Sequence, residues 1–243
     1  MVLEGPALPW KVIKLGLIGS TQATAREYLA SGHGAGTVIV AAGQTDGRGR
    51  RGRSWHSPEG GLYMTASLRP VMEVGLVPLM GGVAVAETIR EMTNIDVGLK
   101  WPNDILIRGK KVGGVLSESG WAGRKTNHVL LGVGVNLNNP PPDWLPEATS
   151  LSEELGRFVD VDSFLDILLE TLDRYIPYLE SRPELILSSW KEMSQTLGRM
   201  VEVTDVDGEA ISGLAVDVAP DGSLLVESGG MIRHVVSGVL ELR

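Results

Sequence analysis

The sequence contains no cysteine among its 243 residues. Disulfides, cysteine-ligated zinc, iron–sulfur clusters and a cysteine nucleophile are therefore excluded. The four histidines, His33, His56, His128 and His234, do not have the spacing of a metal-ligand set. Neither the nucleophile motif G-x-S-x-G nor the phosphate-loop motif G-x-x-x-x-G-K-[ST] occurs. Any chemistry of this chain must come from other groups.

Long apolar runs are also missing. No run approaches the ~18 residues that a membrane span needs. Residues 1–14, MVLEGPALPWKVIK, lack the apolar core of a signal peptide. We therefore expect a cytoplasmic protein that makes no contact with a membrane.

Positive charge is scarce, since 22 Lys and Arg face 30 Asp and Glu and the net charge is −8. A surface of this charge repels nucleic acid, so we expect no nucleic-acid partner. An anion that binds this chain must meet a local basic site.

The composition is that of a globular protein, with 43% hydrophobic and 21% charged residues. Alternating or β-branched runs predict strands, and apolar residues at helical spacing predict helices. Asp162 is expected to cap one helix, and Ser150 with Glu153 fits a capping box. The predicted strands are Lys11–Ile18, Thr37–Ala42, Leu62–Leu68, Val97–Lys100, Ile105–Arg108, Lys111–Glu118 and His128–Asn136; the predicted helices follow Ser20-Thr21, cover Val77–Met92, follow Ser150 and Asp162, and cover Pro183–Met193.

The pattern changes near Thr196. Short β-rich runs then alternate with the turn dipeptides Asp207-Gly208, Asp221-Gly222 and Gly229-Gly230, which are typical of β-hairpins. We predict an α+β domain over residues 1–194, built on a mixed or antiparallel sheet, and a small β-barrel domain over residues 195–243.

Four arginines fall on one glycine-rich loop, Gly47-Arg48-Gly49-Arg50-Arg51-Gly52-Arg53. The glycines match G-x-G-x-x-G, but the following Ser54-Trp55-His56-Ser57-Pro58 cannot begin a helix, so the dinucleotide-binding interpretation fails. Guanidinium groups bind phosphate and carboxylate in a bidentate manner, and glycines allow close approach of the backbone. The loop predicts an anion site, with a solvated basic loop as the alternative.

Three further segments carry polar groups at strand ends. Lys100-Trp101-Pro102-Asn103-Asp104 reads equally as a turn between strands, because Pro102 keeps Trp101 out of a helix. Lys111, before Gly113-Gly114, could place a cation beside a ligand. Alternatively, it is a lysine on an edge strand that prevents aggregation with another chain. Gly132 and Gly134, before Asn136, indicate a close approach by a ligand or by neighbouring backbone.

In this order and spacing, the segments resemble the biotin protein ligase family. The arginine–glycine block together with Lys100–Asp104 is the most specific part. The segments that carry the resemblance are Ser20-Thr21, Gln44, Gly47–Arg53, Trp55–Pro58, Lys100–Asp104, Lys111–Leu116, Gly132–Asn136 and Ala148–Leu151. The resemblance implies a class II synthetase-like catalytic domain followed by an SH3-like β domain.

The resemblance also implies a two-step reaction. Biotin and ATP give biotinyl-5′-AMP and pyrophosphate, and a lysine of a biotin carboxyl carrier protein then attacks the mixed anhydride. Mg²⁺ would accompany ATP, with Asp104 as its protein neighbour. Cations are needed because a carboxylate must approach the α-phosphate of a polyanion.

Site residues follow from the same resemblance. Lys111 and Arg48 are expected to be catalytic, with Lys100 as the second choice for the catalytic lysine. The expected biotin site comprises Ser20, Thr21, Gln22, Gln44, Arg48, Gly49, Arg50, Lys111, Gly114, Gly132 and Gly134, and the expected ATP site comprises Arg50, Arg51, Arg53, Trp55, Lys100, Asn103 and Asn136. Gln22 departs from the family, in which asparagine is frequent at this position.

The sequence leaves other functions open. A lipoate or octanoate ligase or transferase on the same fold is one, and an anion-binding module without catalysis is another. Repressor members of the family carry an N-terminal DNA-binding unit, which needs ~40 residues or more, whereas 19 residues precede Ser20. We therefore expect a ligase that is not a repressor; family members occur as monomers and dimers, so a homodimer is left open.

Overall fold

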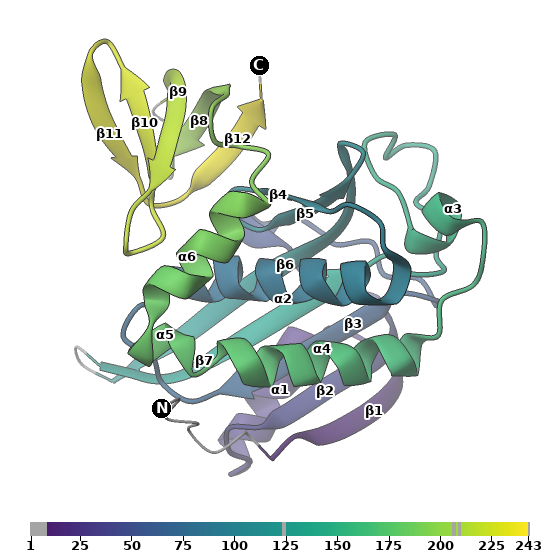
Figure 1. Cartoon of the computed structure of the whole chain (residues 1–243). Helices are drawn as coiled ribbons and strands as arrows, with labels where there is room; N and C mark the ends of the chain where they lie inside the picture. Colours follow the sequence, from purple (N-terminus) through teal and green to yellow (C-terminus); the bar gives the residue numbers. More distant parts are fainter. Residues whose placement is uncertain (1–8, 123–124, 206–207, 209, 243) are drawn as a thin grey trace.

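The chain is described by a computed structural model that covers residues 9–122, 125–205, 208 and 210–242. Asp207, one of the predicted turn residues, lies outside this range. Two sheets organise the structure, a seven-stranded sheet with helices on both faces and a five-stranded sheet near the C-terminus (Figure 1). The α+β prediction is confirmed.

The larger sheet has the strand order β1-β2-β3-β7-β6-β5-β4. Only the β1–β2 pair is parallel, and the other pairs are antiparallel. Its strands are β1 (Lys11–Ile18), β2 (Thr37–Gln44), β3 (Leu62–Leu68), β4 (Gly98–Lys100), β5 (Asp104–Ile107), β6 (Lys110–Ala122) and β7 (Lys125–Val135).

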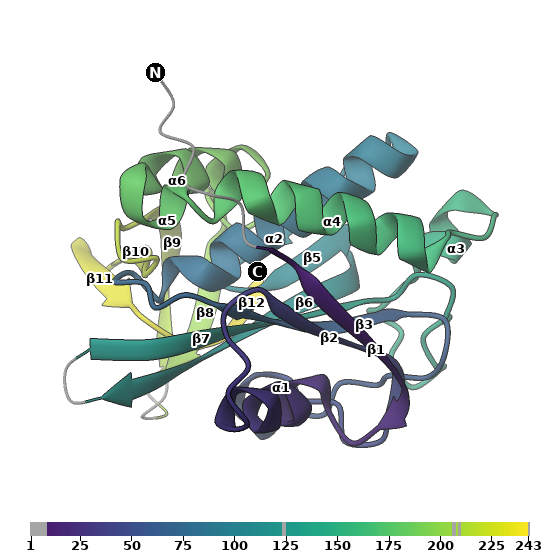
Figure 2. The same cartoon turned by 90° about the horizontal axis from the view of Figure 1, so that it is seen from below.

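The helices are divided unequally between the two faces. Figure 2 shows α1 (Thr21–Ala30) alone on one face, whereas α2 (Leu76–Thr93), α4 (Val161–Tyr175) and α6 (Pro183–Glu192) cover the other. The short helices are α3 (Leu151–Leu155), α5 (Tyr178–Ser181) and the 3-10 turn η1 (Arg50–Gly52).

Side-chain alternation along the central strands explains this division. Met64 of β3 and Val133 of β7 belong to the main core, under α2 and α4. Their neighbours Thr65 and Gly132 face the opposite side and are paired directly across β3 and β7. The face under α2 and α4 therefore carries the main apolar core, while the face beside α1 combines a smaller apolar cluster of Ala25, Ile39 and Leu130 with small and polar residues.

Helix capping agrees with the sequence at one position and differs at another. Ser150 and Glu153 form the predicted capping box of α3. The cap of α4 is Asp160 rather than Asp162, since Asp160 accepts a hydrogen bond from the Ser163 N–H at 2.8 Å. Asp162 lies in the first turn instead, where its carboxylate pairs with Lys14 at 2.7 Å.

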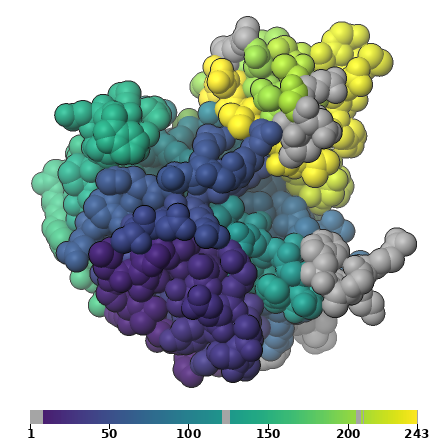
Figure 3. Space-filling model, turned by 180° about the vertical axis from the view of Figure 1, so that it is seen from behind, coloured from purple at the N-terminus to yellow at the C-terminus, as the bar shows by residue number. Residues whose placement is uncertain are grey.

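The smaller sheet is fully antiparallel, with the order β11-β10-β9-β8-β12. The last strand, β12, was not predicted; it pairs with β8 and forms one edge of this sheet. Figure 3 shows this part, in green and yellow, as a lobe against the rest of the chain. Its strands are β8 (Met200–Asp205), β9 (Ala210–Val218), β10 (Leu224–Ser228), β11 (Met231–Val235) and β12 (Gly238–Leu242).

Trp101 joins the two sheets. Its side chain is 1% exposed, and its indole Nε1 donates to the Gly222 carbonyl at 3.0 Å. Its backbone N–H donates to Thr196 Oγ1 at 2.9 Å. Across the described residues, no helix is both long and apolar enough to cross a membrane.

We expect Trp101→Phe to lower the free energy of unfolding by about 1–3 kcal/mol, because the buried Gly222 carbonyl would lose its donor. Urea denaturation followed by circular dichroism measures this loss. Trp10→Phe is the matched control, since the buried Trp10 Nε1 has no hydrogen-bond partner among the described residues. Equal destabilisation by both changes would contradict the assigned role of the Trp101 hydrogen bond.

Candidate active site

A cavity of about 390 Å³ opens on the α1 side of the larger sheet. Except for Arg51, every residue predicted for the site lines it. The predicted residues found there are Ser20, Thr21, Gln22, Gln44, Arg48, Gly49, Arg50, Arg53, Trp55, Lys100, Asn103, Asp104, Lys111, Gly114, Gly132, Gly134 and Asn136. The fold thus brings together segments that lie far apart in the sequence.

One end of the cavity is polar and uncharged. Ser20, Thr21 and Gln22 lie at the start of α1 and are each at most 5% exposed. The Ser20 backbone has the extended geometry of an N-cap, but its hydroxyl makes no capping bond. Ser20 Oγ and Gln22 Nε2 are buried and have no hydrogen-bond partner among the described residues. Buried polar groups are normally paired, so this end is suited to a ligand with its own donors and acceptors.

The floor of the cavity consists of a cross-strand pair of glycines. Gly114 of β6 lies opposite Gly134 of β7. A Cβ atom at Gly134 would lie 2.7 Å from Trp55 Nε1, and one at Gly114 would lie 3.3 Å from Trp55 Cζ3. Because neither position carries a side chain, the Trp55 indole can lie against the sheet.

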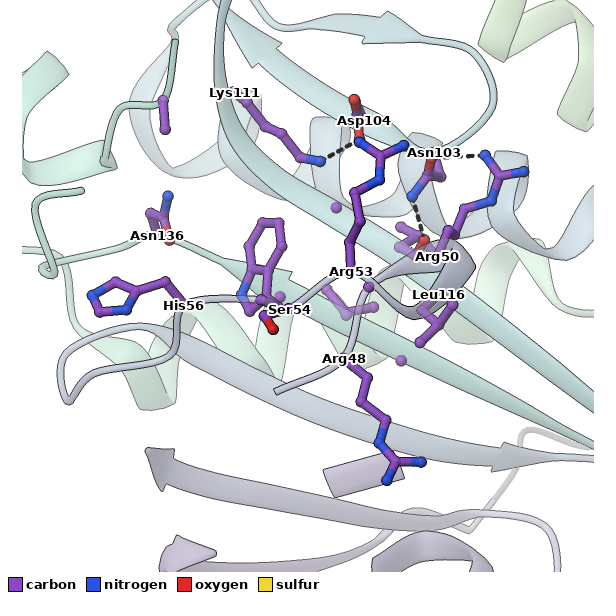
Figure 4. Close-up of a pocket in the computed structure, with 18 of the residues that line it drawn as sticks. Arg48, Arg50, Arg53, Ser54, His56, Asn103, Asp104, Lys111, Leu116 and Asn136 are labelled. Carbon is purple, nitrogen blue, oxygen red and sulfur yellow. Dashed lines mark hydrogen bonds and ion pairs between the residues drawn. The ribbon is translucent and has the colours of Figure 1, made fainter. Parts of the chain in front are cut away.

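Trp55 also contacts a cation, since Lys111 Nζ lies 5.2 Å from the centroid of its ring. The same ammonium group pairs with Asp104 Oδ1 at 2.5 Å (Figure 4). β5 and β6 are neighbours in the sheet, which explains why these two residues meet. Lys111 is thus held between an indole and a carboxylate at the centre of the cavity wall.

The rest of the cavity lining is rich in cations. Five basic side chains line the cavity against two carboxylates, Asp104 and Glu147. Arg48 pairs with Asp46 at 3.2 Å, and both of these side chains are substantially exposed. The basic residues are Arg48, Arg50, Arg53, Lys100 and Lys111. In a chain with a net charge of −8, this concentration indicates an anion site.

Two arginines of the loop contact the C-terminal sheet. Arg50 donates to Ser237 Oγ at 2.7 Å and to Asn103 Oδ1 at 3.3 Å. Burial lowers the pKa of the Arg50 guanidinium from its ordinary value. Arg51 has a φ of 57° and donates to the Thr204 carbonyl at 3.1 Å, which carries its side chain away from the cavity. In Figure 3 the blue loop segment reaches the C-terminal lobe.

Two predicted asparagines are held by backbone groups. Asn103 Nδ2 donates to the Val115 carbonyl at 2.8 Å. Asn136 Nδ2 donates to the Thr149 carbonyl at 3.0 Å, and its Oδ1 accepts from Asn139 at 3.0 Å. Both residues therefore shape the cavity wall. Among the described residues, no group of three His, Cys, Asp or Glu side chains could hold a metal ion.

Several lining residues were not predicted. Thr65 is fully buried and lies within hydrogen-bond distance of Thr21 and Gln22. Asn139 and the β12 residues Gly238, Val239 and Leu240 also line the cavity. The pairing of Thr65 with Gly132 could have suggested the first of these, but only once the strand register was known.

Comparisons with known proteins show the family of this chain. The model for "Biotin/lipoate A/B protein ligase family" matches residues 16–136, and that for "Biotin protein ligase C terminal domain" matches residues 196–243. The bifunctional ligase/repressor BirA of Bacillus subtilis is 36% identical, over 93% of this chain and 72% of its own. The biotin–[acetyl-CoA-carboxylase] ligase of Mycobacterium tuberculosis is 34% identical, over 93% of this chain and 86% of its own.

A solved structure is similar over nearly its whole length. The biotin protein ligase from Aquifex aeolicus, in complex with biotin and ATP, aligns with a TM-score of 0.84 and 32% identity, covering 96% of this chain and 98% of that chain. Fold and family models together define the class as the biotin and lipoate protein ligases. Within that class, the chain belongs to the biotin protein ligase family, as the sequence resemblance indicated.

Gly134→Ala is expected to displace the Trp55 indole, because the new methyl group would lie 2.7 Å from Trp55 Nε1. The indole N–H signal of Trp55 in a ¹H–¹⁵N spectrum should shift, while the signals of the other tryptophans stay in place. Gly16→Ala is the control, since a Cβ there meets nothing within 4 Å. An unmoved Trp55 signal in Gly134→Ala would show that the indole does not lie on the glycine floor.

Proposed function

We propose that this chain activates biotin with ATP, giving biotinyl-5′-AMP and pyrophosphate, and transfers the biotinyl group to a lysine of a biotin carboxyl carrier protein. One observation carries the proposal: a single cavity combines buried, unpaired polar groups at the start of α1 with five basic side chains elsewhere in its lining. Biotin is a neutral bicyclic urea with a carboxylate tail, and ATP is a polyanion. These two sets of lining groups match the two chemistries.

In this proposal the polar end of the cavity receives the bicyclic ring. Ser20, Thr21, Gln22 and Gln44 offer hydrogen bonds there, and Gly132 leaves room beside them. The tail then runs toward Lys111 past the Trp55 indole, which covers the Gly114–Gly134 floor. At this point the carboxylate would meet the α-phosphate of ATP.

The cations act where the two anions meet. Without them, a carboxylate oxygen approaching a phosphate would be repelled, and charge would build up as pyrophosphate leaves. We assign Lys111 to the α-phosphate and carboxylate oxygens, and Arg48 to the same reacting region. The nucleotide side comprises Arg50, Arg53, Trp55, Lys100, Asn103 and Asn136. We propose that Arg51 anchors the loop instead, since its guanidinium binds Thr204 outside the cavity.

Mg²⁺ fits this site as an ion held mainly by the phosphates of ATP, where it would neutralise their charge. The carboxylate of Asp104 is paired with Lys111 and has no further acidic partner to complete a protein-built site among the described residues. Asp104 would thus be a neighbour of the ion and the counter-ion of Lys111 before ligands bind.

The amine nucleophile belongs to the acceptor protein, so the enzyme needs no nucleophile of its own.

We propose the same domain division as the sequence predicted, with residues 1–194 as the catalytic domain and residues 195–243 as the β domain. A nucleic-acid partner is not part of the proposal, and a homodimer stays a prediction.

Incubation with biotin, Mg-ATP and a carrier domain tests the function directly. We expect release of pyrophosphate and a carrier heavier by one biotinyl group in its intact mass. Lipoate in place of biotin should give neither, because its dithiolane ring has no N–H or carbonyl group for the polar end. If the carrier were modified with lipoate but not with biotin, the protein would instead be a lipoate ligase.

Lys111→Ala should slow adenylate formation by about 10²–10³-fold, the usual effect of removing one preorganised charge donor at a reacting oxygen. Pyrophosphate release in single turnovers measures this rate. Lys110→Ala is the matched control, since Lys110 is exposed and does not line the cavity. Equal rates for both variants would remove Lys111 from the mechanism.

A further inference from the structure

A directed chain of hydrogen bonds runs behind the polar end of the cavity. Ser57 Oγ donates to the Trp55 carbonyl at 3.0 Å and accepts from Gln44 Nε2 at 2.9 Å. Gln44 Oε1 accepts from the Thr21 N–H at 2.8 Å, so this oxygen can only be an acceptor. The Thr21 hydroxyl, 3.2 Å from the same oxygen, must then give its hydrogen to Gln44. Backbone groups at two points thus set the direction of the whole chain.

The Thr65 hydroxyl is the next member of the chain. It has a single hydrogen but lies within hydrogen-bond distance of two oxygen atoms. Its Oγ1 lies 2.9 Å from Thr21 Oγ1 and 3.0 Å from Gln22 Oε1. A hydroxyl has one hydrogen, and Thr21 needs it because its own is committed to Gln44. The Thr65–Gln22 contact would then join two oxygens with no hydrogen between them. Meanwhile Gln22 Nε2 is buried without a partner among the described residues.

We infer that the Gln22 amide presents its carbonyl oxygen to the cavity and that its Nε2 donates to Thr65. A half-turn about the Cγ–Cδ bond exchanges the two ends of the amide and changes no other atom, and the choice between them follows from the hydrogen-bond network. The half-turn removes both conflicts: Thr65 accepts from Gln22 while donating to Thr21, and Gln22 Nε2 gains a hydrogen-bond partner. Thr65 is therefore a positioning residue, which acts on the ligand through Gln22.

The position of Gln22 depends on the strand opposite Thr65. Gly132 pairs with Thr65 in the sheet, and a Cβ atom there would lie 2.7 Å from the end of the Gln22 amide. The absence of a side chain at this position allows the amide to lie between α1 and the sheet.

This orientation specifies the kind of ligand. The inference rests on the proposed function, and it assigns to Gln22 the recognition of an N–H group of the cyclic urea of biotin. A dithiolane ring or an alkyl chain has no such donor and would leave a buried carbonyl unpaired. Sites built around a polar group reject analogues that lack it by far more than an apolar pocket can, by up to about 10⁴–10⁵-fold. Gln22 and Thr65 would therefore be specificity determinants against lipoate and octanoate.

Binding of biotin to Thr65 variants tests the positioning role. By isothermal titration calorimetry without ATP, Thr65→Val should raise the Kd for biotin about 10–100-fold, because Gln22 loses its anchor. Thr65→Ser keeps the hydroxyl and should bind within about threefold of the wild type, a difference worth less than 1 kcal/mol. The KM for ATP should be unchanged in both variants. Unchanged biotin affinity in Thr65→Val, or an equal rise in the biotin Kd and the ATP KM, would overturn the inference.

Neutron diffraction from deuterium-exchanged crystals of the unliganded protein tests the orientation independently. We expect the ND₂ group of Gln22 to point at Thr65 Oγ1; an ND₂ group that faces the cavity would refute the assignment. The two proposals fail in different ways. A wild-type protein that neither binds biotin nor releases pyrophosphate contradicts the proposed function, whereas the neutron result depends only on the amide itself.

Discussion

The site depends on the register of β3, β7 and β6. Thr65 lies opposite Gly132, and Gly134 lies opposite Gly114, so small residues form a continuous track on one face. The residues between them point into the core beneath α2 and α4. A slip of one residue would bury the glycines and expose the core to the cavity. Apolar packing on one face therefore holds the binding surface on the other.

Electrostatics sets the second constraint. Five basic side chains share one cavity, and their mutual repulsion opposes assembly of the site. Asp104 reduces this repulsion by pairing with Lys111, and Asp46 does the same for Arg48. An incoming carboxylate or phosphate would compete with these carboxylates for the same cations. The acidic residues thus stabilise the free protein without removing the attraction for an anion.

Much of the site could be predicted because its motifs lie at strand ends and on loops, where unusual residue types stand out. Lys111 and the arginine loop were recognised in this way. Thr65 was not, because a threonine inside a mainly apolar strand looks like any strand residue, and its role appears only with its partners across the sheet. The N-cap at Asp160 was missed because Asp160 and Asp162 are both suitable capping residues. Only the observed start of α4 at Val161 shows that Asp160 is the cap.

The contribution of the C-terminal sheet could not be read from the sequence either, since it arises from contacts between distant segments. Arg50 binds Ser237, Asn103 and the Gly238 carbonyl, all through neutral oxygen atoms. These bonds hold the guanidinium in place without neutralising it, and its lowered pKa reflects the cost of burying the charge. An ion pair at this position would relieve that cost but would also cancel the field toward the cavity. Neutral acceptors from a second sheet therefore keep Arg50 both immobile and available to an anion.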